Sequence, residues 1–311
     1  MIAAIRRHAR VRAGVVTGIG DDCAVLKIPP GHEALVTTDF SLEGIHFRRK
    51  WHPPEVVGHR CLTRGLSDIA AMGGKPIAAF LSLALPRNLP RNWPDRFVEG
   101  LLKLADASQV TLAGGDTAQS PGRILADIVV VGSIPKGTAI RRSGARPGHG
   151  IYVTGELGGS AAALAQLFSG RKLRPDLFPQ HFHPRPRIPV GRYLRERALA
   201  SAMIDISDGL STDLSHICEE SGVGAEIYAD AIPRSRIGRP AREVDLTFAL
   251  HGGDDYELLF TASRNQRLPG RIAGVKVTCI GEITRRRRMV LQGLDGAALA
   301  LRPQGWEHFR Q

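Results

Sequence analysis

Six short stretches that combine aspartate with glycine interrupt the apolar segments of this 311-residue chain. A single such junction is ordinary turn chemistry, because glycine adopts positive φ and aspartate bonds its own backbone. Six of them, set at the ends of apolar runs, indicate a fold whose connections gather carboxylates. They are GIGDDCAVL (Asp21, Asp22), VTTDFSLEG (Asp39), GLSDIAAMGG (Asp68), LAGGDT (Asp116), MIDISDGLSTDL (Asp205, Asp208, Asp213) and HGGDDYELLF (Asp254, Asp255).

The length of the chain and its 43% content of hydrophobic residues exceed the needs of one domain. We therefore predict a mixed α/β (α+β) fold in two domains, residues 1–140 and 141–311. Since the acidic junctions are shared between the two domains, we expect the functional site in the cleft between them.

Periodicity and turn signals predict the main elements of both domains. In the first, we expect Asp39 at the end of a strand and Asp116 in a turn. In the second, we expect residues 169–189, rich in Pro, Arg and His, to form a loop. The predicted strands cover 32–38, 77–85, 124–134, 151–155, 225–229, 256–261 and 277–284, and the helices 54–74, 93–108, 158–168 and 211–221.

The net charge of +12 and the pI near 10.2 favour an anionic partner. Nucleic acid is one candidate, since basic residues release counterions from its phosphates. However, the excess arginine is scattered, and 5% aromatic residues leave few platforms for stacked bases. We interpret Arg285–Arg288 as a solvated hairpin turn. A small anionic substrate is the preferred interpretation, and a nucleic-acid-binding protein is the alternative from a different class.

No run of about 18 uncharged apolar residues occurs, and the first 12 residues lack the apolar segment of a signal peptide. We expect a soluble, cytoplasmic protein that binds no membrane. Its four cysteines are far apart, lie in apolar contexts and form no CxxC pair. We predict that Cys23, Cys61, Cys218 and Cys279 are reduced core thiols.

Clustered carboxylates with glycines beside them suit hard cations, above all Mg²⁺, and Mg²⁺ is commonly completed by phosphate oxygens. This chemistry indicates phosphoryl transfer. The sequence has no GxxxxGK[ST] loop, no protein-kinase motifs and no GxSxG elbow. His181 and His183 have the look of a zinc pair but no nearby third ligand. His46, directly after the Asp39 strand, could contact substrate or be an ordinary hydrogen-bonded histidine.

In this order, the motifs resemble the thiamine-monophosphate kinase family, in the superfamily that also holds aminoimidazole ribonucleotide synthetase and selenophosphate synthetase. The resemblance covers essentially the whole chain. It implies ATP-dependent phosphorylation of thiamine monophosphate to thiamine diphosphate by direct in-line transfer with several Mg²⁺ ions. It also implies a homodimer in which N-terminal strands of two subunits form a shared barrel. The matching motifs include TTDFSLEGIHF, LSDIAAMGG, GGDT, RSGARPG, IYVTGELGGSAAAL, HPRPR, IDISDGLSTDL, GGDDYELLF and GWEHF.

The resemblance also implies roles for single residues. The first domain would bind ATP and Mg²⁺ and form the dimer. Metal ligands would be Asp22, Thr37, Thr38, Asp39, Asp68, Asp116, Asp205 and Asp208, of which Asp39, Asp68, Asp116 and Asp205 would be catalytic. Gly115, Asp116, Arg142 and Ser207 would contact the nucleotide, and His46, Asp254 and Trp306 the thiamine substrate.

Three positions depart from the family pattern. Asp254 stands where glutamate is usual, Gly65 where asparagine is usual, and His149 replaces the aspartate of a PGD motif. None removes a proposed metal ligand. The main enzymatic rival is an aminoimidazole ribonucleotide synthetase-like ligase. The selenophosphate branch would need a reactive cysteine in a glycine-rich loop, and the hydrogenase-maturation branch ends in cysteine, whereas this chain ends in Gln311.

Overall fold

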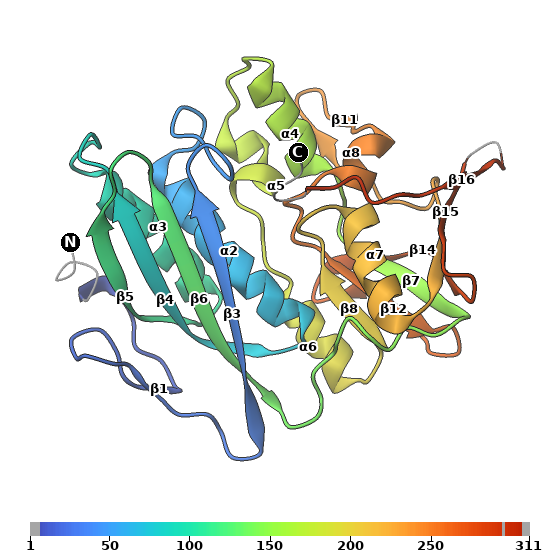
Figure 1. Ribbon diagram of the computed structural model, residues 1–311, viewed down its shortest axis with the longest axis horizontal. Helices are drawn as coiled ribbons and strands as arrows, with labels where there is room; N and C mark the ends of the chain where they lie inside the picture. The colour runs from blue at the N-terminus through green and yellow to red at the C-terminus, as the bar shows by residue number, and fades with distance from the viewer. Residues whose placement is uncertain (1–6, 294–295, 307–311) are drawn as a thin grey trace. The chain divides into compact units, whose positions relative to one another are not determined.

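The computed structural model describes residues 7–293 and 296–306, which divide into two compact units (Figure 1). The first unit comprises residues up to 69 together with 74–138. The second comprises 70–73 and the chain from 139 onward. The predicted mixed α/β architecture is confirmed.

The first unit is built on a four-stranded sheet in the order β3-β6-β4-β5. β6 pairs antiparallel with both β3 and β4, and β4 pairs parallel with β5. The helices α2 and α3 cover one face of the sheet (Figure 1). The other face leaves Val36 and Phe40 of β3 exposed. The elements are β3 (His32–Leu42), α2 (Pro54–Ala71), β4 (Lys75–Leu85), α3 (Trp93–Ala107), β5 (Thr111–Gln119) and β6 (Leu125–Pro135).

The two helices touch through glycine. A Cβ at Gly58 of α2 would lie 1.9 Å from the Phe97 carbonyl oxygen, and one at Gly100 of α3 would lie 1.9 Å from that of Glu55. No side chain fits at either position, so the backbones can meet directly. The apolar face of α2 is buried, with Val57, Cys61, Leu62 and Ile69 at most 2% exposed.

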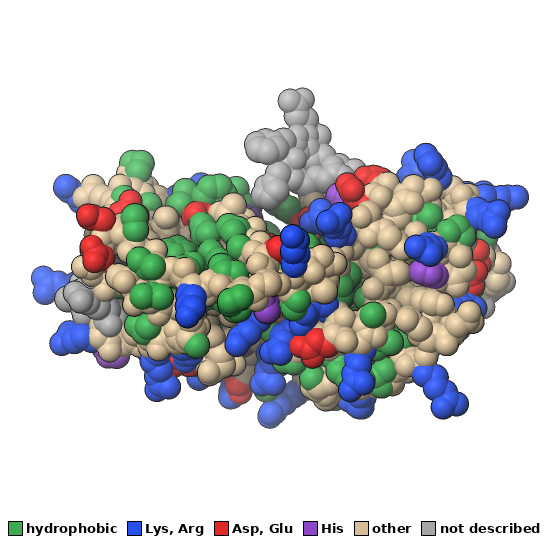
Figure 2. All heavy atoms as spheres, turned by 90° about the horizontal axis from the view of Figure 1, so that it is seen from below, with side chains coloured by type: hydrophobic (Ala, Val, Ile, Leu, Met, Phe, Trp, Pro, Cys, Tyr) green, Lys and Arg blue, Asp and Glu red, His purple; other side chains and the backbone are tan. Residues whose placement is uncertain are grey.

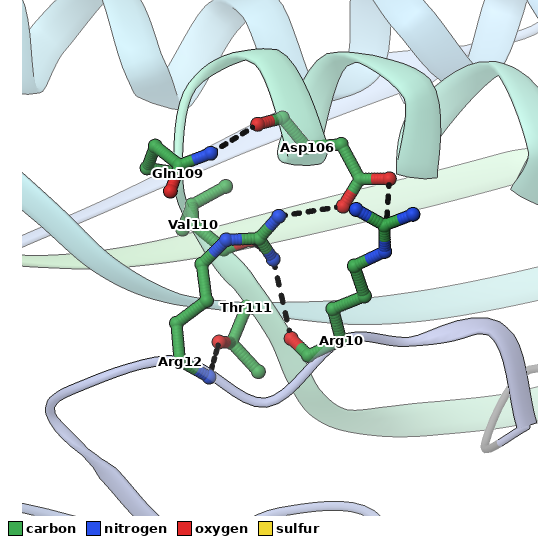
Figure 3. Close-up of polar contacts among 6 residues, drawn as sticks. All are labelled: Arg10, Arg12, Asp106, Gln109, Val110 and Thr111. Carbon is green, nitrogen blue, oxygen red and sulfur yellow. Dashed lines mark hydrogen bonds and ion pairs between the residues drawn. The ribbon is translucent and has the colours of Figure 1, made fainter.

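Arg12 fastens the N-terminal segment to the edge of this sheet (Figure 3). Its Nη2 donates to Asp106 Oδ1 at 2.7 Å, and its backbone N–H donates to Thr111 Oγ1 at 3.0 Å. The chain then forms the short strands β1 (Val15–Thr17) and β2 (Val25–Leu26). As a result, the loop between these strands lies against β5, where Gly18 approaches Ala113.

The second unit holds an eight-stranded sheet in the order β16-β15-β9-β14-β7-β12-β8, with β13 paired to β14. Neighbouring strands of this sheet are antiparallel, except for β15 and β9, which are parallel. The principal core includes Ile151, Val153, Ile204, Leu214 and Leu259. The strands are β7 (His149–Thr154), β8 (Ala202–Asp205), β9 (Gly224–Tyr228), β12 (Leu258–Ser263), β13 (Arg271–Ile272), β14 (Val275–Thr284), β15 (Met289–Gln292) and β16 (Ala298–Ala300), and β10 (Arg236–Ile237) pairs with β11 (Arg242–Glu243).

Helices of the second unit are α4 (Gly159–Phe168), α5 (Pro179–Phe182), α6 (Ile188–Glu196), α7 (Leu210–Ser221) and α8 (Leu246–His251), with a 3₁₀ turn at Pro175–Leu177. The segment 169–189, predicted as a loop, therefore contains helical turns. Residues 70–73 join this unit because Ala70 and Ala71 pack with Val190 and Leu194.

Two local predictions were wrong in part. Arg285–Arg288 are exposed, but they do not close a hairpin, because β9 lies between β14 and β15. Cys61 and Cys218 are buried, and burial raises the pKa of each thiol to about 12. Cys23 and Cys279, by contrast, are exposed. An apolar sequence context does not reveal whether a loop or strand edge covers the thiol.

Lys and Arg side chains are spread over the face seen in Figure 2 instead of forming one stripe. In the described part of the chain, every helix is too short or too polar to cross a lipid bilayer.

Candidate functional site

The seam between β3 and α2 brings together three of the predicted residues. Thr37 Oγ1 donates a hydrogen bond to Asp68 Oδ2. Strand alternation places Asp39 on the same face as Thr37 and Ser41. Ser41 bonds the Cys61 thiol, and the charge of Asp39 contributes to the raised pKa of that thiol. Asp39 therefore stands on the seam between the Thr37–Asp68 and Ser41–Cys61 contacts.

Gly65 sets the close approach of α2 to the sheet at this seam. A Cβ there would lie 2.6 Å from Val130 Cγ2, a fully buried side chain of β6, and 3.6 Å from Thr37 Cγ2. The asparagine that is usual at this position would not fit. Glycine in place of the family's asparagine at position 65 thus allows α2 to pack tightly on the sheet, one helical turn before Asp68.

We expect Gly65→Ala to destabilise the protein, although alanine favours helix by about 1 kcal/mol over glycine. Overpacking a rigid core costs about 1–3 kcal/mol, so the net change should lower the thermal midpoint by a few degrees. In a double-mutant cycle, Val130→Ala should relieve the clash, so that Gly65→Ala costs less in that background. Purely additive effects would show that Val130 is not the obstacle.

The opposite face of the same sheet carries a second row of polar side chains. Thr38 Oγ1 donates to Asp127 Oδ1 at 2.8 Å, so Thr37 and Thr38 serve opposite faces. Asp127 pairs in register with Ser82, and Ser82 with Asp116. Asp127 was not among the predicted site residues. Its only signal in the sequence is one acid inside an apolar strand.

Asp39 and Asp116 lie inside strands, contrary to the predicted strand end and turn. β3 continues to Leu42, and β5 runs from Thr111 to Gln119. The two residues stand on the two edge strands, three strand spacings or about 14 Å apart. Asp116 belongs to the register row of Ser82 and Asp127, on the sheet face opposite to that of Asp39.

A pocket of about 620 Å³ opens beside β5. Its walls come from the loop 18–24 and from residues 112–117, so it joins Asp22, Gly115 and Asp116. Asp21 Oδ1 accepts the N–H of Asp22 at 3.1 Å, in keeping with a role in shaping the turn. Gly115 has φ +145°, and a Cβ there would lie 1.9 Å from the Leu81 carbonyl oxygen. Only glycine brings Asp116 to this wall.

His46 is held by the end of β3. Its Nδ1 accepts the Leu42 N–H at 2.9 Å, so the neutral ring carries its proton on Nε2. Glu43 stabilises the same loop: its carboxylate accepts hydrogen bonds from Arg49 Nε at 2.5 Å and from the Ile124 N–H at 3.0 Å. The imidazole is therefore fixed in orientation and tautomer.

In the second unit, the turn after β8 is organised around Asp213. Asp213 Oδ2 accepts the backbone N–H groups of Ser207, Asp208 and Gly209 at 3.1, 3.2 and 3.1 Å. Burial, followed by the charges of Asp205 and Asp208, raises the pKa of Asp213 well above its usual range.

Three segments with predicted site residues meet at this turn. The Asp254 N–H donates to the Ser207 carbonyl at 2.8 Å, and the Trp306 N–H donates to the Asp208 carbonyl at 3.1 Å. Asp205 precedes the turn at the end of β8 and is 5% exposed. Trp306 is 52% exposed, which does not fit a buried apolar anchor. The remainder of the GWEHF motif, residues 307–309, lies outside the described residues.

The Asp254 side chain is fixed by Tyr256, whose hydroxyl donates to Asp254 Oδ1 at 2.6 Å. Both residues have positive φ, 65° and 52°, which is rare for a tyrosine and marks a strained loop. Asp255 turns inward, where its Oδ2 accepts the Gly158 N–H at the start of α4. Burial raises the pKa of Asp255 well above its usual range.

Glu257, which follows this loop in the chain, accepts hydrogen bonds from Arg187 and from Thr154 Oγ1. Thr154 Oγ1 in turn accepts the Leu258 N–H at 2.8 Å. The HPRPR motif therefore contributes a half-buried arginine that supports the Asp254 loop.

Other predicted residues stay apart. The backbone of Arg142 bonds Ser221 at the last residue of α7, whereas Ser207 precedes the first turn of that helix. Twelve helical residues span about 18 Å. His181 is buried against Ser160, with Nδ1 to Oγ 3.0 Å. Among the residues that the structure describes, no three His, Cys, Asp or Glu side chains are grouped to hold a metal by themselves.

Residues 20–134 match the family described as AIR synthase related protein, N-terminal domain, and residues 146–293 match its C-terminal domain. The two units and their carboxylate-bearing segments are those of an AIR synthase related protein. Within that class, the thiamine-monophosphate kinase of Salmonella typhimurium is 39% identical over 315 residues, covering 96% of this chain and 93% of that protein. This chain belongs to the thiamine-monophosphate kinase family, so the resemblance seen in the motifs is confirmed.

Solved structures agree. The thiamine-monophosphate kinase from Stenotrophomonas maltophilia K279a has a TM-score of 0.83 and 35% identity, with 96% of each chain covered. A structure described as AaThiL complexed with AMPPCP and TMP has a TM-score of 0.79 and 31% identity, covering 90% of this chain and 89% of that one.

Proposed function

We propose that this chain phosphorylates thiamine monophosphate with ATP, forming thiamine diphosphate and ADP. The observation that carries the proposal is the similarity over about nine-tenths of the chain to a structure described with AMPPCP and TMP. The cytoplasm, where ATP is abundant, is the proposed location.

The reaction joins two anions. An oxygen of the thiamine phosphate bonds to the γ-phosphorus of ATP as the bond from that phosphorus to the β-phosphate oxygen breaks. A phosphate monoester is largely ionised near pH 7, because its second pKa is about 6. The acceptor therefore needs no general base, and the chain must mainly hold and align the two substrates.

The pocket beside β5, which contains Gly115 and Asp116, is our proposed phosphate end of the nucleotide site, with Arg142 and Ser207 as further nucleotide contacts. Its volume of about 620 Å³ falls in the usual range for small-ligand pockets. His46, Asp254 and Trp306 are the proposed contacts for thiamine monophosphate. Asp254 is a shorter acid than the family's glutamate, and the bond from Tyr256 fixes its direction.

Mg²⁺ fits the donor chemistry of the proposed ligands, which are carboxylates and hydroxyls. They occur in separate small groups, as suits an ion that keeps waters and is completed by phosphates. When bound, Mg²⁺ offsets negative charge on the transferring group. The residues that would hold it are Asp22, Thr37, Thr38, Asp39, Asp68, Asp116, Asp205 and Asp208.

The proposal is tested by incubating the purified chain with ATP, Mg²⁺ and thiamine monophosphate and identifying products by mass spectrometry. We expect thiamine diphosphate and ADP in equal amounts, and no phosphorylation of unphosphorylated thiamine. Formation of aminoimidazole ribonucleotide from its amidine precursor would favour the ligase alternative. Salt-sensitive retention on DNA without ATP turnover would favour a nucleic-acid-binding protein.

We propose in addition that the uncovered sheet face of the first unit pairs with a second copy of the chain. Val36 and Phe40 are 68% and 54% exposed there, and apolar residues on one face of a sheet favour burial. The wild type should sediment as a dimer at micromolar concentration, and Val36→Asp as a monomer. Leu299→Asp, an equally exposed position in the second unit, should leave the dimer intact. A monomeric wild type would rule the pairing out.

A further inference from the structure

We infer that Asp213 is a positioning residue: by holding the backbone turn at residues 207–209, it fixes the positions of both Asp254 and Trp306. The inference rests on the proposed function only for the identity of the substrate. It starts from a buried carboxylate to which neither the family resemblance nor the proposed reaction assigns a task.

The N–H groups of the turn at residues 207–209 are bound by the Asp213 side chain. This side chain is 1% exposed, and a single oxygen accepts three consecutive N–H groups, from Ser207 to Gly209. A carboxylate oxygen is a stronger acceptor than an amide oxygen, so three donors on one atom favour aspartate. Two further buried acids of this unit, Asp255 and Glu257, bond different segments.

The carbonyl side of the turn holds the substrate-contacting residues. Consecutive carbonyls, of Ser207 and Asp208, accept the N–H groups of Asp254 and Trp306. Each of these residues follows a glycine that could carry no side chain. A Cβ at Gly253 would lie 2.5 Å from the Ser207 carbonyl oxygen, and one at Gly305 would lie 2.0 Å from that of Asp208.

The segments 253–254 and 305–306 thus contact the turn in the same manner, one at the Ser207 carbonyl and the other at the Asp208 carbonyl. Gly305 adds a bond of its own, donating to Thr212 Oγ1 at 3.0 Å. Residues 254 and 306 are far apart in sequence, and the turn is the element to which both are bonded. Once Asp213 fixes the turn, the spacing between the backbones at Asp254 and Trp306, which carry the two side chains, is fixed as well.

The test compares Asp213→Asn with Thr261→Val, which removes a buried hydroxyl bonded to Ser201 in the same unit, away from the turn. Residue-resolved amide exchange should show at least tenfold faster exchange at Asp254 and Trp306 in Asp213→Asn. Exchange at Leu258, bonded to Thr154, should be unchanged. The KM for thiamine monophosphate should rise about tenfold in Asp213→Asn, whereas Thr261→Val should lower the thermal midpoint without altering KM.

Unchanged exchange at both amides, or unchanged KM in a folded Asp213→Asn variant, would overturn the inference. Should that variant not fold, Gly305→Ala decides: the inference expects a higher KM for thiamine monophosphate with little change for ATP, and an unaltered KM refutes it. If the wild type does not phosphorylate thiamine monophosphate, the proposed function fails, while the exchange measurement still decides whether Asp213 positions the two segments.

Discussion

Asp68→Asn is expected to reduce turnover by about two to three orders of magnitude while leaving the fold intact. Asp68 is half-buried on the seam, where Thr37 donates to it and Asp39 stands close by. Asparagine keeps the shape and can still accept the Thr37 hydrogen bond, but it removes the charge that a hard cation needs. Losing several kcal/mol of charge stabilisation in the transition state corresponds to this fall in rate.

Loss of activity should exceed loss of stability. Removing one of two neighbouring negative charges relieves repulsion, so the thermal midpoint without metal should not fall. Mg²⁺ should raise the midpoint of the wild type more than that of Asp68→Asn. The matched control is Asp95→Asn, an exposed acid in the first turn of α3, which should leave kcat unchanged. Near-normal Mg²⁺-dependent turnover in Asp68→Asn would show that Asp68 is not part of a shared metal site.

Sequence pattern predicted most elements well because apolar periodicity follows directly from burial. Two of its errors fall on the candidate site. The predicted strand 32–38 stops before Asp39, yet β3 extends to Leu42 because β6 offers an unbroken partner as far as Leu125. GGDT predicts a turn by its glycines, but β4 pairs with it throughout, and Gly115 is required because Leu81 approaches closely. In both cases tertiary pairing overrides the local signal.

Roles that depend on contacts between distant segments left little trace in the sequence. Asp213 is an acid in the first turn of α7, a common placement beside a helix N-terminus, and nothing local shows that it binds the preceding turn. Likewise, Gly65 differs from the family pattern for a reason that lies in Val130, on another strand. By contrast, Asp22 and Asp116, to which the family resemblance assigns the same role, line one pocket.

Trp306→Ala is expected to raise the KM for thiamine monophosphate about tenfold or more, with little change in the KM for ATP. Trp306 is 52% exposed, while its backbone N–H donates to the Asp208 carbonyl, so the residue is anchored by its backbone and remains accessible to a ligand. A cation over an indole gains about 0.5–2 kcal/mol, and the thiazolium of the substrate is cationic. About 1.4 kcal/mol corresponds to a factor of ten in affinity.

Two comparisons separate this substrate contact from a structural one. Trp306→Phe keeps an aromatic face and should recover part of the lost affinity, because the backbone bond to Asp208 does not depend on the side chain. Phe168→Ala removes a similarly exposed aromatic residue, 60% exposed at the end of α4, and should alter neither KM. Equal weakening of both substrates together with a lower thermal midpoint would instead mean that the indole stabilises the chain end. The aromatic face for thiamine would then have to be sought elsewhere.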